Sequence, residues 1–353
     1  MEKVRLGVIG AGGIAAILHL PELAELSQVE VRLVAGRKPE RLQRLCQDYG
    51  IPAWTQSYDE VVADPQLDAV VVATPHPLHV RWAVAALEAG KHVLVQKPLC
   101  ADLDEADALV AAAEKSDRTV LCLPHFSPSV HALQQQCAAG AIGRISGARC
   151  RSAHGGPEVY YAGVRREFGE TEDDSLWFFD AAQASVGALF DMGVYAVASL
   201  VAVLGSARRV VGATATFDKP TQLEDQATLV LEMANGGLAT AETSWCDPAR
   251  SRELSIHGTA GKFTAPGVDG AEVTQWTPTS YSDERAPVEM RPLDCSQSLG
   301  NAHRHFVDCI GAGHQPPLSH VWAARHVTEI LLAGLESGRS GRAVDLRTRA
   351  EPS

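Results

Sequence analysis

The chain has 353 residues, of which 46% are hydrophobic and 21% are charged, and its formal net charge is -12. This length exceeds what one hydrophobic core usually organises, so we expect two domains. The negative charge and the lack of a Lys/Arg-rich run argue against nucleic acid or an anionic membrane as the partner, and they favour a small molecule.

The N-terminus, MEKVRLGVIGAGG, has an acidic residue at position 2 and a glycine after a few apolar residues. This fits neither a signal peptide nor a membrane span, so we expect a cytoplasmic protein. The eight cysteines form no CxxC pair, which favours reduced thiols. The histidines include no HExxH, and His303 and His305 have the i, i+2 spacing that points two helical side chains apart, so no metal site is expected.

The first third of the chain alternates between two kinds of segment. Short apolar runs occupy residues 4–9, 29–35, 68–73, 91–95 and 119–122. Helical periodicity occurs near 14–26, 38–49, 77–89 and 103–115. This alternation predicts a doubly wound parallel sheet with helices on both faces, and we assign it to a first domain, residues 1–123.

The pattern changes in residues 124–353. A helix is predicted near 127–138, a loop-like stretch at 154–175 that ends in the acidic ETEDDS, and a long helix at 187–204. The β-rich segments 208–217, 225–245 and 252–263 follow, with a hairpin turn at ANGG, and then two helices near 299–311 and 319–336. We therefore predict an α+β second domain with an open, mostly antiparallel sheet.

A glycine-rich loop, GVIGAGGIAA, follows the first predicted strand. Gly10, Gly12 and Ala15 give the G-x-G-x-x-G/A arrangement between a strand and a helix, which predicts a Rossmann dinucleotide site. Gly10 allows the tight turn, Gly12 lets a pyrophosphate approach the backbone, and the helix start supplies amide donors. We assign Gly13 and Ile14 of the same loop to the cofactor site as well.

The end of the second predicted strand bears on the choice of cofactor. Gly36 stands where an acidic residue would bind the ribose diol of NAD, and Arg37 and Lys38 follow it. These basic residues suit a 2′-phosphate, so NADP is favoured over NAD. The alternatives are a solvated basic start to the next helix, or stacking of Arg37 on the adenine of either cofactor.

The chain resembles the glucose-fructose oxidoreductase / inositol dehydrogenase / MocA (Gfo/Idh/MocA) family over nearly its full length. The residues that carry the resemblance are Gly10 to Ala15, the stretch 71–99 that ends in HVLVQKPL, GALFDMGVYAVASL at 187–200, and GRAVDL at 341–346. The resemblance implies a Rossmann domain, a second domain on an open antiparallel sheet, and NAD(P)-dependent chemistry on sugars, cyclitols or related alcohols and ketones. It also implies homodimers or homotetramers that assemble through the C-terminal sheet.

Two motifs of that family are altered here. Gln96-Lys97-Pro98 stands where the family generally has Glu-Lys-Pro, so the lysine is kept while the charge before it is lost. Thr74 and Pro75 match the family's loop under the cofactor. His79 matches a histidine of that region, for which capping of the helix start is the alternative to cofactor contact.

The second motif, usually Asp-x-Gly-x-His, here begins with Asp191 and ends with Tyr195. A tyrosine is similar to the glucose-fructose oxidoreductase and dihydrodiol dehydrogenase branches, where it serves as acid/base. The exchange keeps a proton donor but moves the ordinary pKa from about 6.5 to about 10. Asp191 and Tyr195 are spaced i, i+4, so they share one face of the predicted helix, whose other side is apolar. The alternative is a helix whose tyrosine covers an apolar patch and whose aspartate meets water.

We therefore assign catalysis to three residues. Lys97 follows a parallel strand at the edge where such sheets bind ligands, which predicts that it lies beside the nicotinamide. Tyr195 is predicted to be the proton donor, Lys97 its electrostatic partner, and Asp191 an anchor for a substrate hydroxyl. The alternative is that Lys97 is the formal proton donor. His125 and Trp177 are predicted to line the substrate cleft, with a structural loop histidine and a core tryptophan as the alternatives.

The predicted function is an NAD(P)-dependent oxidoreductase that transfers a hydride between the nicotinamide and a secondary alcohol or ketone of a sugar or sugar derivative. One alternative is a dehydrogenase or reductase of a dihydrodiol or non-sugar carbonyl. Another is a non-catalytic sensor of dinucleotide or sugar, against which the joint presence of Lys97, Asp191 and Tyr195 argues.

Overall fold

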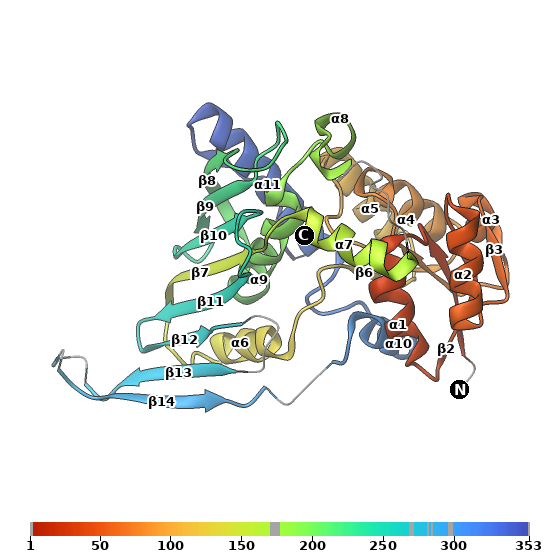
Figure 1. Cartoon of the computed structure of the whole chain (residues 1–353). Coiled ribbons are helices and arrows are strands. Elements are labelled where there is room, and N and C mark those ends of the chain that lie inside the picture. Colours follow the sequence, from red (N-terminus) through yellow and green to blue (C-terminus); the bar gives the residue numbers. More distant parts are fainter. Residues whose placement is uncertain are drawn as a thin grey trace. The chain divides into compact units, whose positions relative to one another are not determined.

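The computed structural model describes residues 3–169, 177–267, 272–280, 282–283, 285–295 and 299–351 (Figure 1). The acidic segment 170–175 lies outside the described residues. The chain forms two compact units. Unit 1 contains residues 1–125, 157–177 and 299–328, and unit 2 contains residues 126–156, 178–298 and 329–353. Two segments that lie beyond residue 150 in the sequence, 157–177 and 299–328, thus belong to unit 1.

Unit 1 is built on a six-stranded parallel sheet in the order β3-β2-β1-β4-β5-β6. Its strands are β1 (Val4–Ile9), β2 (Val29–Ala35), β3 (Ala53–Thr55), β4 (Ala69–Val72), β5 (His92–Val95) and β6 (Val120–Cys122). Its helices include η1 (Ala15–His19), α1 (Leu20–Ala24), α2 (Pro39–Tyr49), α3 (Tyr58–Ala63), η2 (His76–Leu78), α4 (His79–Glu88), α5 (Leu103–Glu114), α7 (Pro157–Phe168) and α10 (Ala302–Ala312). The strand order reverses between β1 and β4, the point at which open α/β sheets bind ligands.

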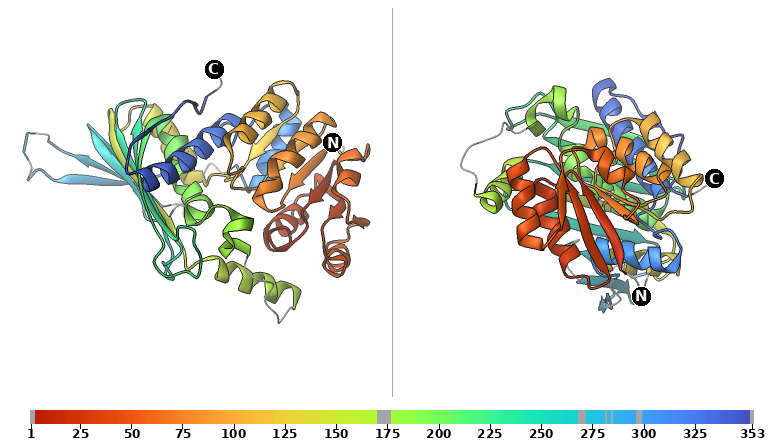
Figure 2. Two further views of the ribbon diagram at one scale, coloured as in Figure 1. Left: turned by 90° about the horizontal axis from the view of Figure 1, so that it is seen from above. Right: turned by 90° about the vertical axis from the view of Figure 1, so that its right-hand side faces the viewer.

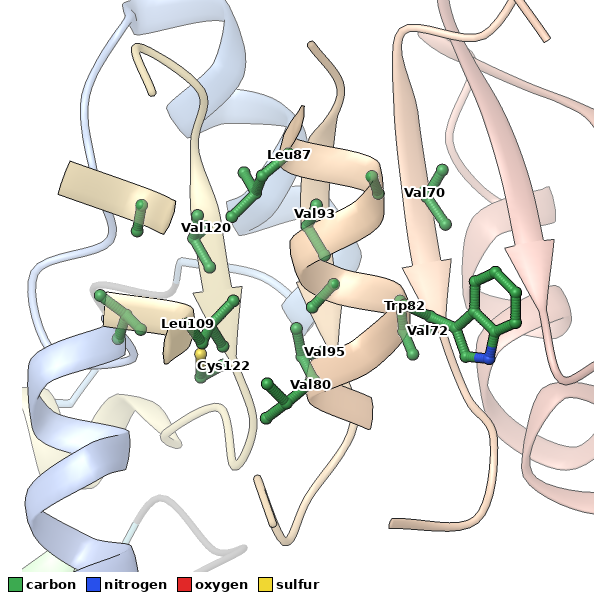
Figure 3. Close-up of a cluster of buried hydrophobic side chains, with 14 of the residues drawn as sticks. Val70, Val72, Val80, Trp82, Leu87, Val93, Val95, Leu109, Val120 and Cys122 are labelled. Carbon is green, nitrogen blue, oxygen red and sulfur yellow. The ribbon is translucent and has the colours of Figure 1, made fainter. Parts of the chain in front are cut away.

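Both faces of this sheet are covered, because successive residues of each strand point to opposite sides. Val70 and Val72 belong to an apolar cluster that includes residues of α4 and α5, as Figure 3 shows. Val71 belongs to a second cluster, which includes Leu20 of α1 and Phe306 of α10. Burial on two faces explains why β4, with the sequence AVVV, and β6, with the sequence VLC, are continuous apolar runs.

Unit 2 is built on a nine-stranded sheet in the order β14-β13-β12-β11-β7-β10-β9-β8-β15. In the left view of Figure 2, its green to light-blue strands lie side by side. Its strands are β7 (Ile145–Ala153), β8 (Ala207–Ala215), β9 (Gln226–Met233), β10 (Leu238–Ser244), β11 (Ser251–Gly258), β12 (Gly261–Ala265), β13 (Val273–Pro278), β14 (Val288–Leu293) and β15 (Val344–Asp345). Its helices include α6 (Pro128–Ala138), α8 (Ala181–Ala184), η4 (Leu189–Gly193) and α9 (Val194–Leu204). Helices η3 (Trp177–Phe179) and α11 (Val321–Ser340) contain the unit boundaries. All pairs are antiparallel except β7 with β10.

The predicted fold class is confirmed, with local differences. The loop-like stretch predicted at 154–175 contains α7, a helix of 12 residues, so that prediction was wrong there. Short β3 and α3 were not predicted, because three residues of strand and six of helix are too few for a periodic signal. Within the described residues, no helix is long and apolar enough to cross a membrane.

Candidate active site

The glycine loop of unit 1 is shaped by its neighbours. Gly10 has φ +87°, and a Cβ there would lie 2.5 Å from the backbone nitrogen of Thr74, so only glycine lets the loop pass the end of β4. The backbone N–H groups of Gly10 and Ala11 both donate to the carbonyl of Ala35. At Gly12, the nearest atom a Cβ would meet is the oxygen of Gly10 at 3.9 Å. The approach that a pyrophosphate needs at Gly12 is therefore open.

Two further features of this loop fit a bound dinucleotide. The Oγ1 of Thr74 is buried, and no residue of the described ranges gives it a hydrogen bond. A buried hydroxyl of this kind is costly unless a ligand completes it. Ile14 precedes the first turn of η1 and no side chain caps that turn, so backbone donors at the helix start suit phosphate oxygens. Pro75 follows Thr74 and leads into η2.

Helix α7 packs on the same loop, which the sequence did not predict. A Cβ at Gly13 would lie 2.6 Å from Cγ2 of Val164 and 2.7 Å from the hydroxyl of Tyr160. Further along α7, the ring of Phe168 lies 4.6 Å from the guanidinium of Arg41 in α2. The lack of a side chain at Gly13 therefore gives α7 room to pack on the loop, and contact of Gly13 with the coenzyme remains a prediction.

The end of β2 is tightly packed at position 36. A Cβ on Gly36 would lie 3.1 Å from Cδ2 of Leu42 and 3.2 Å from the oxygen of Ala11. The acid that binds the ribose diol in NAD enzymes has little room there. Arg37 accepts a hydrogen bond on its carbonyl from Gln56, and Lys38 is the N-cap residue of α2.

His79 joins two loops of unit 1. Its Nδ1 lies 2.8 Å from the carbonyl oxygen of Pro98, and its Nε2 lies 2.7 Å from that of Thr74. Burial lowers the pKa of His79, although hydrogen bonds to these carbonyls act in the opposite direction. Both ring nitrogens are engaged by the backbone, so the imidazole ties the loop after β4 to the loop after β5.

Lys97 lies just beyond β5, where Lys97–Pro98 is a cis peptide. Its backbone N–H donates to Oε1 of Gln96 over 2.7 Å. The other end of the Gln96 amide lies 3.2 Å from Nε2 of His19. Gln96 is thus buried with protein contacts at both ends.

The two predicted cleft residues of unit 1 have ring contacts. Nε2 of His125 lies 3.1 Å from Nδ1 of His305, and the rings of Trp177 and His76 are 5.7 Å apart. His303 has other partners than His305, in keeping with the predicted divergence of the two rings. Within the described residues, no group of three or more His, Cys, Asp or Glu side chains is arranged so that it could hold a metal ion.

In unit 2, the motif helix is fixed at its start and along its length. Oε1 of Glu224 accepts hydrogen bonds from the backbone N–H groups of Gly187 and Leu189, at 3.0 and 3.2 Å. A Cβ at Gly187 would lie 2.1 Å from the carbonyl oxygen of Glu224, so the contact requires glycine. At Gly193, a Cβ would lie 3.2 Å from Cγ2 of Thr243 in β10. The glycine of the motif therefore seats the helix closely on the sheet.

Asp191 has two aromatic partners that the sequence did not reveal. Its Oδ2 accepts a hydrogen bond of 2.9 Å from Nε1 of Trp245 and lies 3.4 Å from Nε2 of His154. Nδ1 of His154 accepts from the N–H of Gly156, so a neutral His154 carries its proton on Nε2, facing the carboxylate. Trp245 follows β10 and His154 follows β7, which are neighbouring parallel strands.

Tyr195 lies in the same region of unit 2. It packs against a cluster formed by Ala188, Met192 and Trp245, and the guanidinium of Arg252 lies 4.6 Å from its ring. Trp245, which donates to Asp191, therefore belongs to the cluster on which Tyr195 packs. Phe190 and Val194, Val197 and Val201 of α9 are buried, as predicted. Lys97 belongs to unit 1, and its pairing with Tyr195 over one coenzyme remains a prediction.

Comparison with known families identifies the chain. The model of the oxidoreductase family with an NAD-binding Rossmann fold (GFO_IDH_MocA) matches residues 4–123, and that of the GFO/IDH/MocA C-terminal domain matches residues 130–264. The chain belongs to the Gfo/Idh/MocA family. It is accordingly an NAD(P)-binding oxidoreductase, and the resemblance found in its motifs is confirmed.

Relatives within the Gfo/Idh/MocA family differ in their named activities. D-xylose 1-dehydrogenase (NADP(+)) 2 of Haloferax volcanii is 27% identical, over 96% of this chain and 99% of that protein. Trans-1,2-dihydrobenzene-1,2-diol dehydrogenase of Oryctolagus cuniculus is 28% identical, over 88% and 89%. Levoglucosan dehydrogenase in complex with NADH and L-sorbose shares the fold, with a TM-score of 0.83 and 20% identity over 98% and 99% of the two chains.

Proposed function

We propose that this oxidoreductase transfers a hydride between NADP and a secondary alcohol or ketone of a sugar or sugar derivative. The observation that carries the proposal is the setting of Asp191, whose carboxylate is held by Trp245 in the cluster that also contacts Tyr195. A fixed carboxylate next to a phenol suits a substrate with neighbouring hydroxyl groups. The activity named for the Haloferax relative, on D-xylose, supports a sugar.

In the proposed reaction, the nicotinamide supplies or accepts the hydride. During reduction, the hydroxyl of Tyr195 gives its proton to the substrate carbonyl oxygen, and during oxidation the phenolate takes the hydroxyl proton. The ammonium of Lys97 donates a second hydrogen bond to the same oxygen and stabilises negative charge on it. The carboxylate of Asp191 accepts a hydrogen bond from an adjacent substrate hydroxyl.

NADP is the proposed coenzyme because of the end of β2. Gly36 stands in place of the diol-binding acid, and Arg37 and Lys38 supply charges that suit a 2′-phosphate. The Haloferax relative is named as an NADP(+) enzyme, whereas levoglucosan dehydrogenase was solved with NADH. Gly10, Gly12 and Thr74 would hold the pyrophosphate side of either coenzyme.

A dihydrodiol is the second candidate substrate. The cluster around Tyr195 also takes in Phe178 and Phe179, whose rings lie 6.5 and 6.0 Å from that of Trp245. Aromatic walls of this kind favour a flat apolar ring beside the two hydroxyl groups. The activity named for the Oryctolagus relative is on such a diol.

We also propose that the protein is a homodimer or homotetramer that pairs through the sheet of unit 2. Val211 of β8 and Val230 of β9 are cross-strand neighbours with 45% and 38% exposure. On β7 and β10, the guanidinium of Arg149 pairs with the carboxylate of Glu242. This face combines apolar and charged groups, as subunit interfaces do. Light scattering of wild type and Val230→Lys tests the proposal, and an unchanged mass would contradict it.

A substrate panel tests the proposed activity. Purified protein is given aldoses, polyols, ketosugars and trans-dihydrodiols with NADP and with NAD, and the absorbance of the reduced nicotinamide is followed. We expect turnover with a sugar-like alcohol and a higher kcat/KM with NADP. Turnover confined to dihydrodiols would support the second candidate, and preference for NAD would contradict the coenzyme assignment.

A further inference from the structure

A row of buried polar groups crosses unit 1 from Lys97 to Glu22. The N–H of Lys97 donates to Gln96, whose amide nitrogen lies 3.2 Å from Nε2 of His19. Nδ1 of His19 lies 2.8 Å from Nε2 of His303, and Nδ1 of His303 lies 2.8 Å from Oε2 of Glu22. Gln96, His19 and His303 are 7%, 0% and 1% exposed. Three buried side chains thus connect the backbone of Lys97 to one partly exposed carboxylate.

The direction of every hydrogen bond in this row is set at Lys97. A backbone N–H can only donate, so the atom of Gln96 that faces it must be the carbonyl oxygen. The NH₂ group of Gln96 then faces His19, whose Nε2 must accept. A neutral imidazole that accepts at Nε2 carries its proton on Nδ1 and donates there.

The same reasoning continues to the end of the row. Nε2 of His303 accepts from His19, so a neutral His303 also carries its proton on Nδ1. That proton points at the carboxylate of Glu22, which needs a donor. A single arrangement of donors and acceptors therefore satisfies all members when both rings are neutral.

We propose that His19, His303 and Glu22 are positioning residues that hold the backbone of Lys97 through Gln96, and that this row requires an amide at position 96. The role of Lys97 rests on the proposed function. A carboxylate at position 96 would face the accepting Nε2 of His19, acceptor against acceptor.

Protonation of His303 would disturb the hydrogen bond between Gln96 and the backbone N–H of Lys97. A proton on Nε2 of His303 makes this atom a donor, so His19 must accept at Nδ1 and carry its own proton on Nε2. That proton faces the NH₂ group of Gln96, donor against donor. Rotation of the amide removes the clash only by taking the acceptor away from the N–H of Lys97.

The surroundings of His19 favour the neutral arrangement. Burial lowers the pKa of His19 well below its usual range, and the charges of His303 and His79, were they protonated, act in the same direction. Glu22 meets the row at Nδ1 of His303. Neutral rings therefore keep the row in the single arrangement that serves Lys97.

Nitrogen NMR of the imidazole rings is the first test, and it needs neither substrate nor turnover. In wild-type protein near neutral pH, we expect the rings of His19 and His303 to be neutral with the proton on Nδ1. His19→Asn and His303→Asn assign the signals. An Nε2–H tautomer or a charged ring at either position would overturn the proposal.

The variant Gln96→Glu is the second test. In the folded state, one proton must stay between the introduced carboxylate and His19. In the unfolded chain, both groups have lost their protons above a pH of about 6.5. The folded state binds more protons, so stability falls as pH rises, and the unfolding constant relative to wild type grows by up to about tenfold per pH unit. In wild type, the lowered pKa of His19 gives the opposite sign, since stability is lost as pH falls below about 6.5.

Urea unfolding of both proteins across this pH range measures the two slopes. Gln275→Glu is the matched control, because the amide of Gln275 donates to the carbonyl of Ala141 rather than to a histidine. We expect the control to follow the wild-type profile. Parallel profiles for wild type and Gln96→Glu would overturn the proposal; if this variant does not fold, the tautomers of the wild-type rings decide.

Measurement of kcat tests whether Gln96 positions Lys97. Gln96→Glu should lower kcat by about tenfold in the wild-type background, but change nothing further in the Lys97→Ala background, because it acts through Lys97. Independent losses in the two backgrounds would contradict the role. A failed substrate panel leaves the NMR and unfolding results unchanged, so the two proposals fail separately.

Discussion

The two units build their parts of the proposed site in different ways. In unit 1, the groups that fit the coenzyme are mostly backbone, set by Gly10, Gly12 and the loop end at Thr74. In unit 2, the groups that suit the substrate are side chains. Asp191 lies in helix η4, and its partners Trp245 and His154 follow the ends of β10 and β7. The comparison teaches that a backbone site is visible in a short stretch of sequence, whereas a site of side chains depends on long-range pairing.

The largest expected effect is on turnover, and it tests the side-chain site. Tyr195→Phe removes the proposed proton donor, and Lys97→Ala its partner, so each should lower kcat by about 10²- to 10⁴-fold while NADP still binds. Steady-state kinetics and dinucleotide fluorescence titration measure the two effects. Tyr58→Phe in unit 1, where the ring packs on Trp82, is the control. Near-wild-type turnover in either variant would remove that residue from the mechanism.

The next effect separates folding from binding in the backbone site. Gly10→Ala forces a side chain onto φ +87° and against Thr74, so we expect the free energy of unfolding to fall by about 3 kcal/mol. The added methyl group of Gly12→Ala meets no close atom, so its free energy of unfolding should lie within about 0.5 kcal/mol of the wild-type value. The variant should nevertheless bind NADP more weakly.

Denaturant unfolding and coenzyme titration of the two glycine variants distinguish these outcomes. Equal loss of stability in both would contradict the assignment of Gly12 to the ligand and Gly10 to the turn. NADP binding by Gly12→Ala as tight as in wild type would also contradict the assignment of Gly12 to the ligand.

A smaller effect is expected from the support of Asp191. Trp245→Phe removes a hydrogen-bond donor from the carboxylate, which should cost about 1–3 kcal/mol of stability and lower kcat/KM. Trp276→Phe is matched to it, since Nε1 of Trp276 donates to the hydroxyl of Thr264 in the same unit. If both variants lose the same fraction of kcat/KM, Trp245 has no particular role at the site.

The smallest effect concerns the coenzyme preference. Arg37→Ser should lower the ratio of kcat/KM for NADP to that for NAD by about tenfold, because it removes one charge-assisted contact with the 2′-phosphate. Arg44→Ser removes a charge from the helix that follows, where Arg44 pairs with Asp48, and should leave the ratio unchanged. An unchanged ratio in Arg37→Ser would favour the alternative of a solvated basic helix start.

What the sequence could reveal follows from the same difference. Apart from the short β3, the strands of unit 1 and the glycine loop were predicted because their apolar runs and glycine spacing are local. Helix α7 was missed because its pattern is weak and its burial depends on a loop far away in sequence, at Gly13. Trp245, His154 and Arg252 were missed because single residues at strand ends acquire meaning only through the pairing of β7, β10 and β11.

The motif residues were found for a different reason. Asp191, Gly193 and Tyr195 lie within five residues, so one spacing links them. The row through His19 and His303 joins residues 284 positions apart, and no local pattern marks it. His19 is the last residue of η1, and in the sequence nothing distinguishes it from other helical residues. Its role becomes visible only in the structure, where residues of α10 pack in the same cluster as those of η1.

The composition of unit 1 has a consequence for synthesis and for protein engineering. Its first 125 residues are completed by α7 and by residues 299–328, and the backbone of Cys122 in β6 is bonded to Ser319. A gene fragment cut after the parallel sheet would leave His19 without His303 and Gly13 without its covering helix. Unit 1 can therefore be completed only after almost the whole polypeptide has been synthesised, and a coenzyme-binding domain transferred to another protein would need all three segments joined in one chain.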